Sequence, residues 1–210
     1  MIKCNVTVCG TLSRSAVMRT NKEGKPFQTF GINVVIPASA GINKTIEISV
    51  AKDGDDDLSM LAVGTRIEVT GVLTFHKKDE NIWFNLSATG INSFNAGDKD
   101  SITGDMEFRG TLGKKPIDAK NDKKGNPFKV FSGYSSERIS AATDTEEAKY
   151  AFIWVRFVQF NAKDSDWLAP SVGVDVKGDM DITVYNDNIS LGCRVKELAQ
   201  WDKSQSGTNA

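Results

Sequence analysis

Apolar and polar residues alternate with a period of two along most of the chain. Val6 and Val8 stand between polar neighbours, and Ile46, Ile48 and Val50 alternate in the same way. Successive side chains of a β-strand point to opposite faces, so this alternation predicts strands with one buried face. Segments rich in Gly separate the alternating runs and are typical of turns. The pattern therefore predicts an all-β protein.

The chain carries this pattern twice. Several segments of the first half return in the same order in the second half, including a basic turn that leads into Pro-Phe. The recurring pairs are Gly10–Leu12 with Gly110–Leu112, NKEGKPFQTF at Asn21–Phe30 with NDKKGNPFKVF at Asn121–Phe131, Arg66–Gly71 with Gly173–Gly178, and Asn81-Ile82 with Asn188-Ile189. A repeat of this length indicates two copies of one structural unit.

We expect each copy to form a five-stranded OB-fold barrel, with a short helix between strands 3 and 4. The helices are predicted at Asp56–Ala62, where the preceding Asp residues offer an N-cap, and at Asp166–Ala169. Three strands, a short helix and two strands are the plan of the OB fold. A small SH3-like barrel and a split sandwich are the alternatives.

The predicted domains follow the repeat. The first barrel is expected at 1–92 and the second at 106–200. The polar, Gly- and Asp-rich stretch 93–105 reads as a linker, and 201–210 as a flexible C-terminal tail.

Composition supports a soluble globular protein, since 40% of the 210 residues are hydrophobic and 25% are charged. Neither a signal peptide nor a membrane span is expected. The odd number of cysteines, 3, fits reduced thiols in a cytoplasmic protein. The net charge is −1, yet residues 10–30 carry +3 and residues 109–131 carry +5, so the remainder carries −9. Positive charge thus gathers in the two repeated segments, as expected for a surface that binds an anionic partner.

Enzymatic function is not expected. His76 is the only histidine, so neither a His-based triad nor a multi-His metal site can be built. No nucleotide-binding glycine motif is present, and the carboxylates of Asp53–Asp57 lack the spacing of a calcium loop. We expect no cofactor and no metal.

The chain resembles the bacterial single-stranded DNA-binding protein family over roughly Ile2–Ile91 and Met106–Leu198. The matching motifs are the opening Gly-x-Leu, GKPFQTFGINV at Gly24–Val34, VGTRIEVTGVL at Val63–Leu73 and WVRFVQFNAK at Trp154–Lys163. The resemblance implies nucleic-acid-binding roles for Trp154, Arg156, Phe160, Lys163 and Tyr185. The chain departs from the family pattern in two places. KTIEISVAK (Lys44–Lys52) has no aromatic residue, and the acidic C-terminal tip of the family is absent.

The residues of the second copy suit such a role. Trp154, Arg156 and Phe160 share one face of the third predicted strand, whereas Val155 and Phe157 share the other, which suits the barrel interior. Exposed aromatic rings can stack on bases, and a guanidinium can pair with phosphate. Packing of these aromatics against the other barrel is the structural alternative.

Further candidates lie in the repeated turns and in the hairpin between the fourth and fifth strands of the first copy. For Phe27 and Phe128, capping of the barrel end is an equally good interpretation, and of Trp83 and Phe84 we expect Trp83 to be exposed. The additional predicted DNA-binding residues are Arg19, Lys22, Lys25, Phe27, Phe75, Lys77, Trp83, Lys123, Lys124, Phe128 and Lys129.

We therefore predict a sequence-nonspecific single-stranded DNA-binding protein that acts in replication, recombination or repair, in the cytoplasm near the nucleoid. RNA is an alternative ligand, and an OB-fold protein-interaction or primosomal module is the alternative function. Two chains would supply four barrels, so a homodimer is expected. We expect no partners recruited by an acidic tail and no association with a membrane.

Overall fold

The computed structural model describes residues 1–38, 41–59, 61–78, 81–92, 97–140, 147–161 and 165–202. Within these ranges the regular secondary structure consists of β-strands, and no helix occurs. The predicted all-β class is therefore confirmed. The described residues also contain no helix long and apolar enough to cross a membrane.

The strands follow the two halves of the sequence repeat. Their bounds are β1 (Ile2–Thr20), β2 (Pro26–Ile36), β3 (Lys44–Asp53), β4 (Arg66–Lys78), β5 (Asn81–Asn92), β6 (Ser101–Leu112), β7 (Asp118–Asn121), β8 (Pro127–Ser140), β9 (Lys149–Phe160), β10 (Gly173–Tyr185) and β11 (Asn188–Gln200). β6 begins inside the stretch that the sequence assigned to a linker.

The chain divides into two compact units. The N-terminal unit comprises Cys4–Gly104 with Ile182–Ile189, and the C-terminal unit comprises Met1–Lys3, Asp105–Asp181 and Ser190–Ala210.

In the N-terminal unit the strand pairings form a complete cycle. β1 pairs with β2 and β4, β2 pairs with β3, and β5 pairs with both β3 and β4. Of these five pairings, β3–β5 is parallel and the other four are antiparallel. The inward positions of the predicted alternation form the core, which includes the fully buried Val8, Ile32, Ile48, Ile67 and Leu86. The burial of apolar area by these side chains is the main stabilising contribution to the unit.

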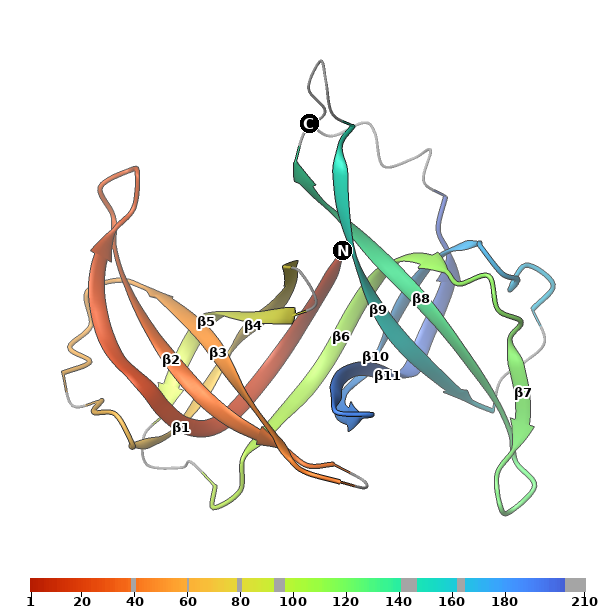
Figure 1. The fold of residues 1–210 in the computed structure, drawn as a ribbon, viewed down its shortest axis with the longest axis horizontal. Helices are drawn as coiled ribbons and strands as arrows, with labels where there is room; N and C mark the ends of the chain where they lie inside the picture. Colours follow the sequence, from red (N-terminus) through yellow and green to blue (C-terminus); the bar gives the residue numbers. More distant parts are fainter. Residues whose placement is uncertain are drawn as a thin grey trace. The chain divides into compact units, whose positions relative to one another are not determined.

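The C-terminal unit repeats this cycle with β6, β8, β9, β11 and β10 in place of β1, β2, β3, β5 and β4. The antiparallel β8–β9 pair can be followed along its length in Figure 1, with the short β7 beside one end of β8. Phe157 of β9 is fully buried, with its ring centroid 4.9 Å from that of Phe108 and 5.3 Å from that of Phe131. These three rings anchor the core beneath β8 and β9.

The predicted helices at Asp56–Ala62 and Asp166–Ala169 are wrong. In the first segment Leu61 N donates to Leu58 O at 2.9 Å, and in the second Leu168 N donates to Ser165 O at 3.1 Å, so each forms an isolated turn among the described residues. A helix of one or two turns has a costly nucleus and few bonds to offset it. In the first segment, Gln28 Nε2 also donates a hydrogen bond to the backbone carbonyl of Asp56 at 2.6 Å, so this carbonyl is bound by a side chain.

The repeated basic turn has the same backbone in both units. Asn21 Oδ1 accepts hydrogen bonds from the backbone N–H groups of Glu23 and Lys25, both at 2.9 Å. Asp122 Oδ1 accepts from those of Lys124 and Asn126, both at 2.8 Å. Gly24 and Gly125, at φ of 80° and 83°, occupy the left-handed region that favours glycine. The sequence repeat at this point thus encodes a turn closed by an Asn or Asp side chain.

Candidate nucleic-acid interface

The outer face of β9 carries a row of exposed side chains. Trp154 is 52% exposed and Phe160 is 43% exposed, and Arg156 between them is exposed as well. Val155 and Phe157 on the opposite face are buried. The alternation predicted for this strand is confirmed, and it leaves two aromatic rings and a guanidinium on one surface.

Side chains of β8 form a second row beside that of β9, because the register of the two strands places them opposite one another. Phe128 lies opposite Phe160, and their ring centroids are 5.7 Å apart. Tyr134 lies opposite Trp154, with 5.0 Å between the centroids. The guanidinium of Arg194, on β11, lies 5.4 Å from the ring centroid of Phe160. Aromatic side chains directly opposite each other on neighbouring strands support one another and hold their rings in place.

Sequence reasoning missed the continuation of this row. Phe152 and Tyr150 are 45% and 52% exposed on the same face of β9, and the ring of Tyr134 meets that of Phe152 edge-on at 5.4 Å. Arg138 of β8 lies opposite Tyr150 and is exposed. The signal was available, because the period of two that placed Trp154 outward extends upstream through KYAFIW. The position of Tyr134 required the β8–β9 register.

We call this surface the aromatic face. It consists of Phe128, Tyr134, Tyr150, Phe152, Trp154, Arg156 and Phe160. From Tyr150 to Phe160 it follows β9 for about 33 Å at the usual strand rise. It is therefore long enough for several nucleotides of an extended strand.

The basic residues predicted for this unit are divided among different positions. Lys123 and Lys124 are exposed in the β7–β8 turn. Lys129 has the strand parity opposite to Phe128, so it lies off the aromatic face. Lys163 lies outside the described residues, and Tyr185, the last residue of β10, is 71% exposed but belongs to the N-terminal unit.

In the N-terminal unit the prediction for Phe75 is wrong. Its side chain is only 5% exposed, because Phe75 lies opposite Phe84 in the β4–β5 register and both point inward, with ring centroids 5.3 Å apart. Trp83 is 56% exposed, as expected, and lies opposite the exposed His76. Lys77 is half-buried.

The remaining candidates of this unit surround its basic turn. Lys22 and Lys25 are exposed, with Lys25 Nζ 3.1 Å from the carboxylate of Glu23. Arg19 is exposed and donates to Thr29 Oγ1 at 3.1 Å. Phe27 is half-buried opposite Asp53. The turn therefore offers two exposed lysines, but the adjacent ring is partly covered.

The N-terminal unit has no counterpart of the aromatic face on the equivalent described strands, β2 and β3. When Phe27 is matched with Phe128, Glu47 takes the place of Trp154 and Asp53 that of Phe160. Glu47 pairs with Arg14 at 2.7 Å. Carboxylates at these positions repel phosphate, so this surface is less suited to nucleic acid than the aromatic face.

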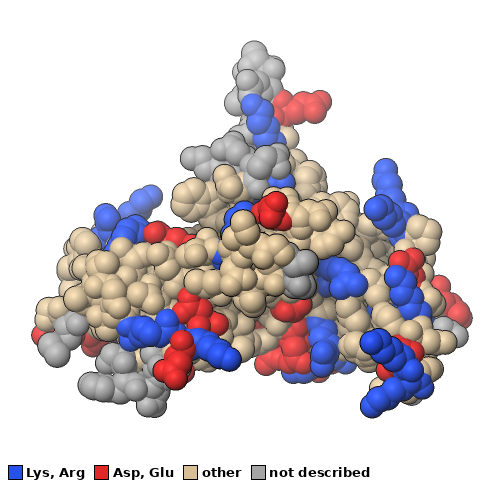
Figure 2. Space-filling view, turned by 60° about the horizontal axis from the view of Figure 1, so that its bottom comes forward, with Lys and Arg blue, Asp and Glu red and all other residues tan. Residues whose placement is uncertain are grey.

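Charged side chains elsewhere are interspersed. On the side shown in Figure 2, Lys and Arg form several separate groups, and Asp or Glu lies beside most of them. Phosphate binding on this side would therefore depend on particular side chains and not on one continuous basic patch.

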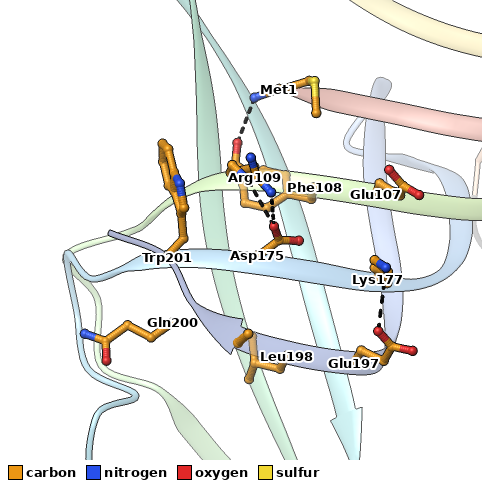
Figure 3. Close-up of a pocket in the computed structure, with 11 residues that line it drawn as sticks. Met1, Glu107, Phe108, Arg109, Asp175, Lys177, Glu197, Leu198, Gln200 and Trp201 are labelled. Carbon is orange, nitrogen blue, oxygen red and sulfur yellow. Dashed lines mark hydrogen bonds and ion pairs between the residues drawn. The ribbon is translucent and has the colours of Figure 1, made fainter. Parts of the chain in front are cut away.

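A hollow of about 670 Å³ in the C-terminal unit illustrates such pairing (Figure 3). Arg109 donates to Asp175 Oδ2 from Nε at 2.9 Å and from Nη2 at 2.6 Å, and it lies 5.8 Å from the centre of the Trp201 ring. The amino group of Met1 donates to the carbonyl of Arg109 at 2.7 Å, and partial burial together with the nearby Arg109 lowers its pKa. Because the guanidinium is already neutralised, this hollow is a poor site for a phosphate.

No cluster of His, Cys, Asp and Glu that could hold a metal ion occurs among the described residues. The groups with the largest pKa shifts, Cys193 and Lys196, owe these shifts to burial and to ion pairs. Burial raises the pKa of the Cys193 thiol to about 12, so this thiol stays protonated, and Lys196 Nζ is held between Asp105 at 2.9 Å and Asp179 at 2.5 Å. Neither group is prepared for proton transfer or nucleophilic attack.

No protein-family model and no curated protein matches the chain. Among solved structures, the chain is similar to the wild-type single-stranded DNA-binding protein from Thermus aquaticus, with a TM-score of 0.48 and 15% identity, over 100% of this chain and 96% of that one. It is also similar to the Plasmodium falciparum single-stranded DNA-binding protein in complex with single-stranded DNA, with a TM-score of 0.35 and 20% identity over 47% and 94%. PriB from Ralstonia solanacearum has a TM-score of 0.34 and 15% identity over 47% and 97%. The first two of these structures are of single-stranded DNA-binding proteins, the family that the sequence motifs of this chain resemble.

Proposed function

We propose that the chain binds single-stranded DNA without sequence preference, through the aromatic face of its C-terminal unit. The observation that carries this proposal is the exposed row of Trp154, Arg156 and Phe160 above a buried core. Water-exposed aromatic rings on a rigid strand are costly unless a ligand covers them. Bases provide such a ligand, since each can stack on a ring whatever its identity.

The charges near this face complete the binding chemistry. The guanidinium of Arg156 can pair with a phosphate or stack on a base, and Lys123 and Lys124 lie at the end of the turn that leads into Phe128. We assign secondary contacts to Lys163 and Lys129, and in the N-terminal unit to Arg19, Lys22, Lys25, Phe27, Lys77, Trp83 and Tyr185. Phe75 is excluded because it belongs to the core.

We further infer that each unit is an OB-fold barrel, with the domains at 1–92 and 106–200. The order of pairing, in which the third strand meets the fifth in parallel, supports this assignment. Such a protein would cover single strands exposed during replication, recombination or repair in the cytoplasm, and a homodimer would bring four barrels together.

The test is a titration of fluorescently labelled oligo-dT with the full chain at several salt concentrations. Binding is expected to weaken steeply as salt increases, because phosphate contacts release condensed counterions. Duplex competitors should displace the probe poorly, since paired bases do not expose their faces. An unlabelled oligo-U competitor measures the preference between DNA and RNA, which differ in the 2′-hydroxyl. Absence of binding at low salt would refute the proposal and favour a protein partner for the aromatic face.

A further inference from the structure

A groove of about 760 Å³ opens beside the aromatic face in the C-terminal unit. One wall is formed by Tyr134 and Trp154, which belong to the aromatic face, and by Val130 and Ser132 of β8. The other side is formed by the segment that follows β6, including Lys114, Lys115 and Pro116. A volume of this size is within the range of about 300–1,000 Å³ that is usual for sites of small organic ligands.

The segment after β6 is held against the aromatic wall. Gly113 N donates to Ser132 O at 2.8 Å, and Ser171 N donates to Gly113 O at 3.3 Å. A Cβ on Gly113 would lie 3.1 Å from Cζ3 of Trp154, so only glycine leaves the indole undisturbed. Ser171, which also lines the groove, adopts a φ of 66°, a conformation that is uncommon for a residue other than glycine. The backbone thus fixes both the ring and the loop beside it.

The positive charges of Lys114 and Lys115 at the groove are suited to bind a phosphate. Lys114 and Lys115 are both exposed, and within the described part of the chain neither forms an ion pair. The carboxylate of Asp118, which also lines the groove, lies 3.6 Å from Lys120 Nζ. The groove therefore combines an aromatic and apolar wall with two cations that form no ion pair with any described residue. A nucleotide needs both, a flat surface for its base and positive charge for its phosphate.

We propose that this groove is a subsite for one nucleotide of the bound strand, with its base against the Tyr134–Trp154 wall and its phosphate at Lys114 and Lys115. The proposal rests on the proposed function and extends it. On this proposal, the bound DNA strand follows β8 and β9 and then turns at Trp154 into the groove. The segment after β6 then becomes part of the DNA-binding surface, in line with the positive charge that the sequence gathers in residues 109–131.

The experiment compares two double variants that remove the same charge from exposed positions of this unit. Lys114→Ser with Lys115→Ser removes the proposed phosphate contacts, and Lys3→Ser with Lys177→Ser is the matched control. Affinity for labelled oligo-dT is measured as a function of salt. The groove variant is expected to reduce the slope of log K against log salt by about 0.7 per lost phosphate contact, up to about 1.4. The control should retain the slope of the wild type.

A second readout locates the ligand. In amide NMR spectra of the wild type, the resonances of Gly113 and Ser171 should shift when oligo-dT is added, because their N–H groups border the groove. The inference is overturned if the wild type binds oligo-dT while both double variants have the same salt slope and these resonances do not move. If the wild type itself fails to bind, the proposed function is overturned together with this inference. Thermal melts that match the wild type exclude misfolding of the variants.

Discussion

Replacement of Trp154 is the most direct test of the aromatic face. About half of the side chain is exposed and available to a base, whereas the other half packs on Tyr134 and against Gly113. Base–aromatic stacking contributes about 1–3 kcal/mol per base. Trp154→Ala should therefore weaken binding of oligo-dT by about 5- to 150-fold.

The same substitution also affects stability, and this effect has to be separated from binding. Burial of roughly half of an indole contributes about 2–3 kcal/mol at the usual value per unit area. We therefore expect a lower melting temperature for Trp154→Ala, and binding should be measured well below it. Trp154→Phe keeps a ring on the strand and should lose less affinity than the Ala variant.

Trp201→Ala is the matched control, since Trp201 is a half-buried tryptophan of the same unit that lies beside Arg109 and outside the aromatic face. The assay is fluorescence anisotropy of labelled oligo-dT, together with quenching of tryptophan emission. Trp154→Ala should lose most of the quenching, and Trp201→Ala should keep it. Equal losses of affinity in the two variants, or an unchanged affinity in a folded Trp154→Ala protein, would refute the stacking argument.

Three further predictions follow from the same geometry. Phe152→Ala and Tyr150→Ala should weaken binding of long oligo-dT at least about fivefold but affect a short oligonucleotide less, and equal effects at all lengths would contradict an extended path along β9. Phe75→Ala should lower the free energy of unfolding by about 3–5 kcal/mol, measured by denaturant titration, because it leaves a cavity beside Phe84; a variant of wild-type stability with impaired DNA binding would return Phe75 to the site. Hydrogen bonds from the Asn126 side chain and from backbone N–H groups lower the pKa of Asp122. The stability that this carboxylate contributes is therefore present above about pH 4, and it is lost as the pH falls through the lowered pKa. Asp122→Asn, which copies Asn21 of the first turn, should remove this acid dependence in melts between about pH 2 and 5, and an unchanged acid dependence would show that another group is responsible.

The unequal halves of the chain are relevant to its mechanism. Both units have the same order of strand pairing and the same closed turn, but Glu47 and Asp53 stand where the C-terminal unit has Trp154 and Phe160. A shared backbone thus supports different surfaces, because outward positions of a strand contribute little to the core and can vary freely. Under the proposed function, most of the stacking would take place on the C-terminal unit.

The sequence by itself determined the features that depend on local pattern. The period of two placed Val155 and Phe157 inward and Trp154 and Phe160 outward, because a strand alternates its side chains whatever its neighbours are. The repeated turn could be found from its Asn or Asp and its Gly, since both residues act within a few positions of the chain.

Tertiary structure decided the features that depend on long-range register. Phe75 precedes His76 and Lys77 but shares the parity of the buried Val69 and Leu73, and its position opposite Phe84 places it in the core. Tyr134 joins Trp154 only because β8 and β9 pair in one register, and the groove exists only because Gly113 and Ser171 meet beside that ring. Pairing between distant segments has no local signature in one sequence, because the free energy that selects a register comes from side chains packing across strands.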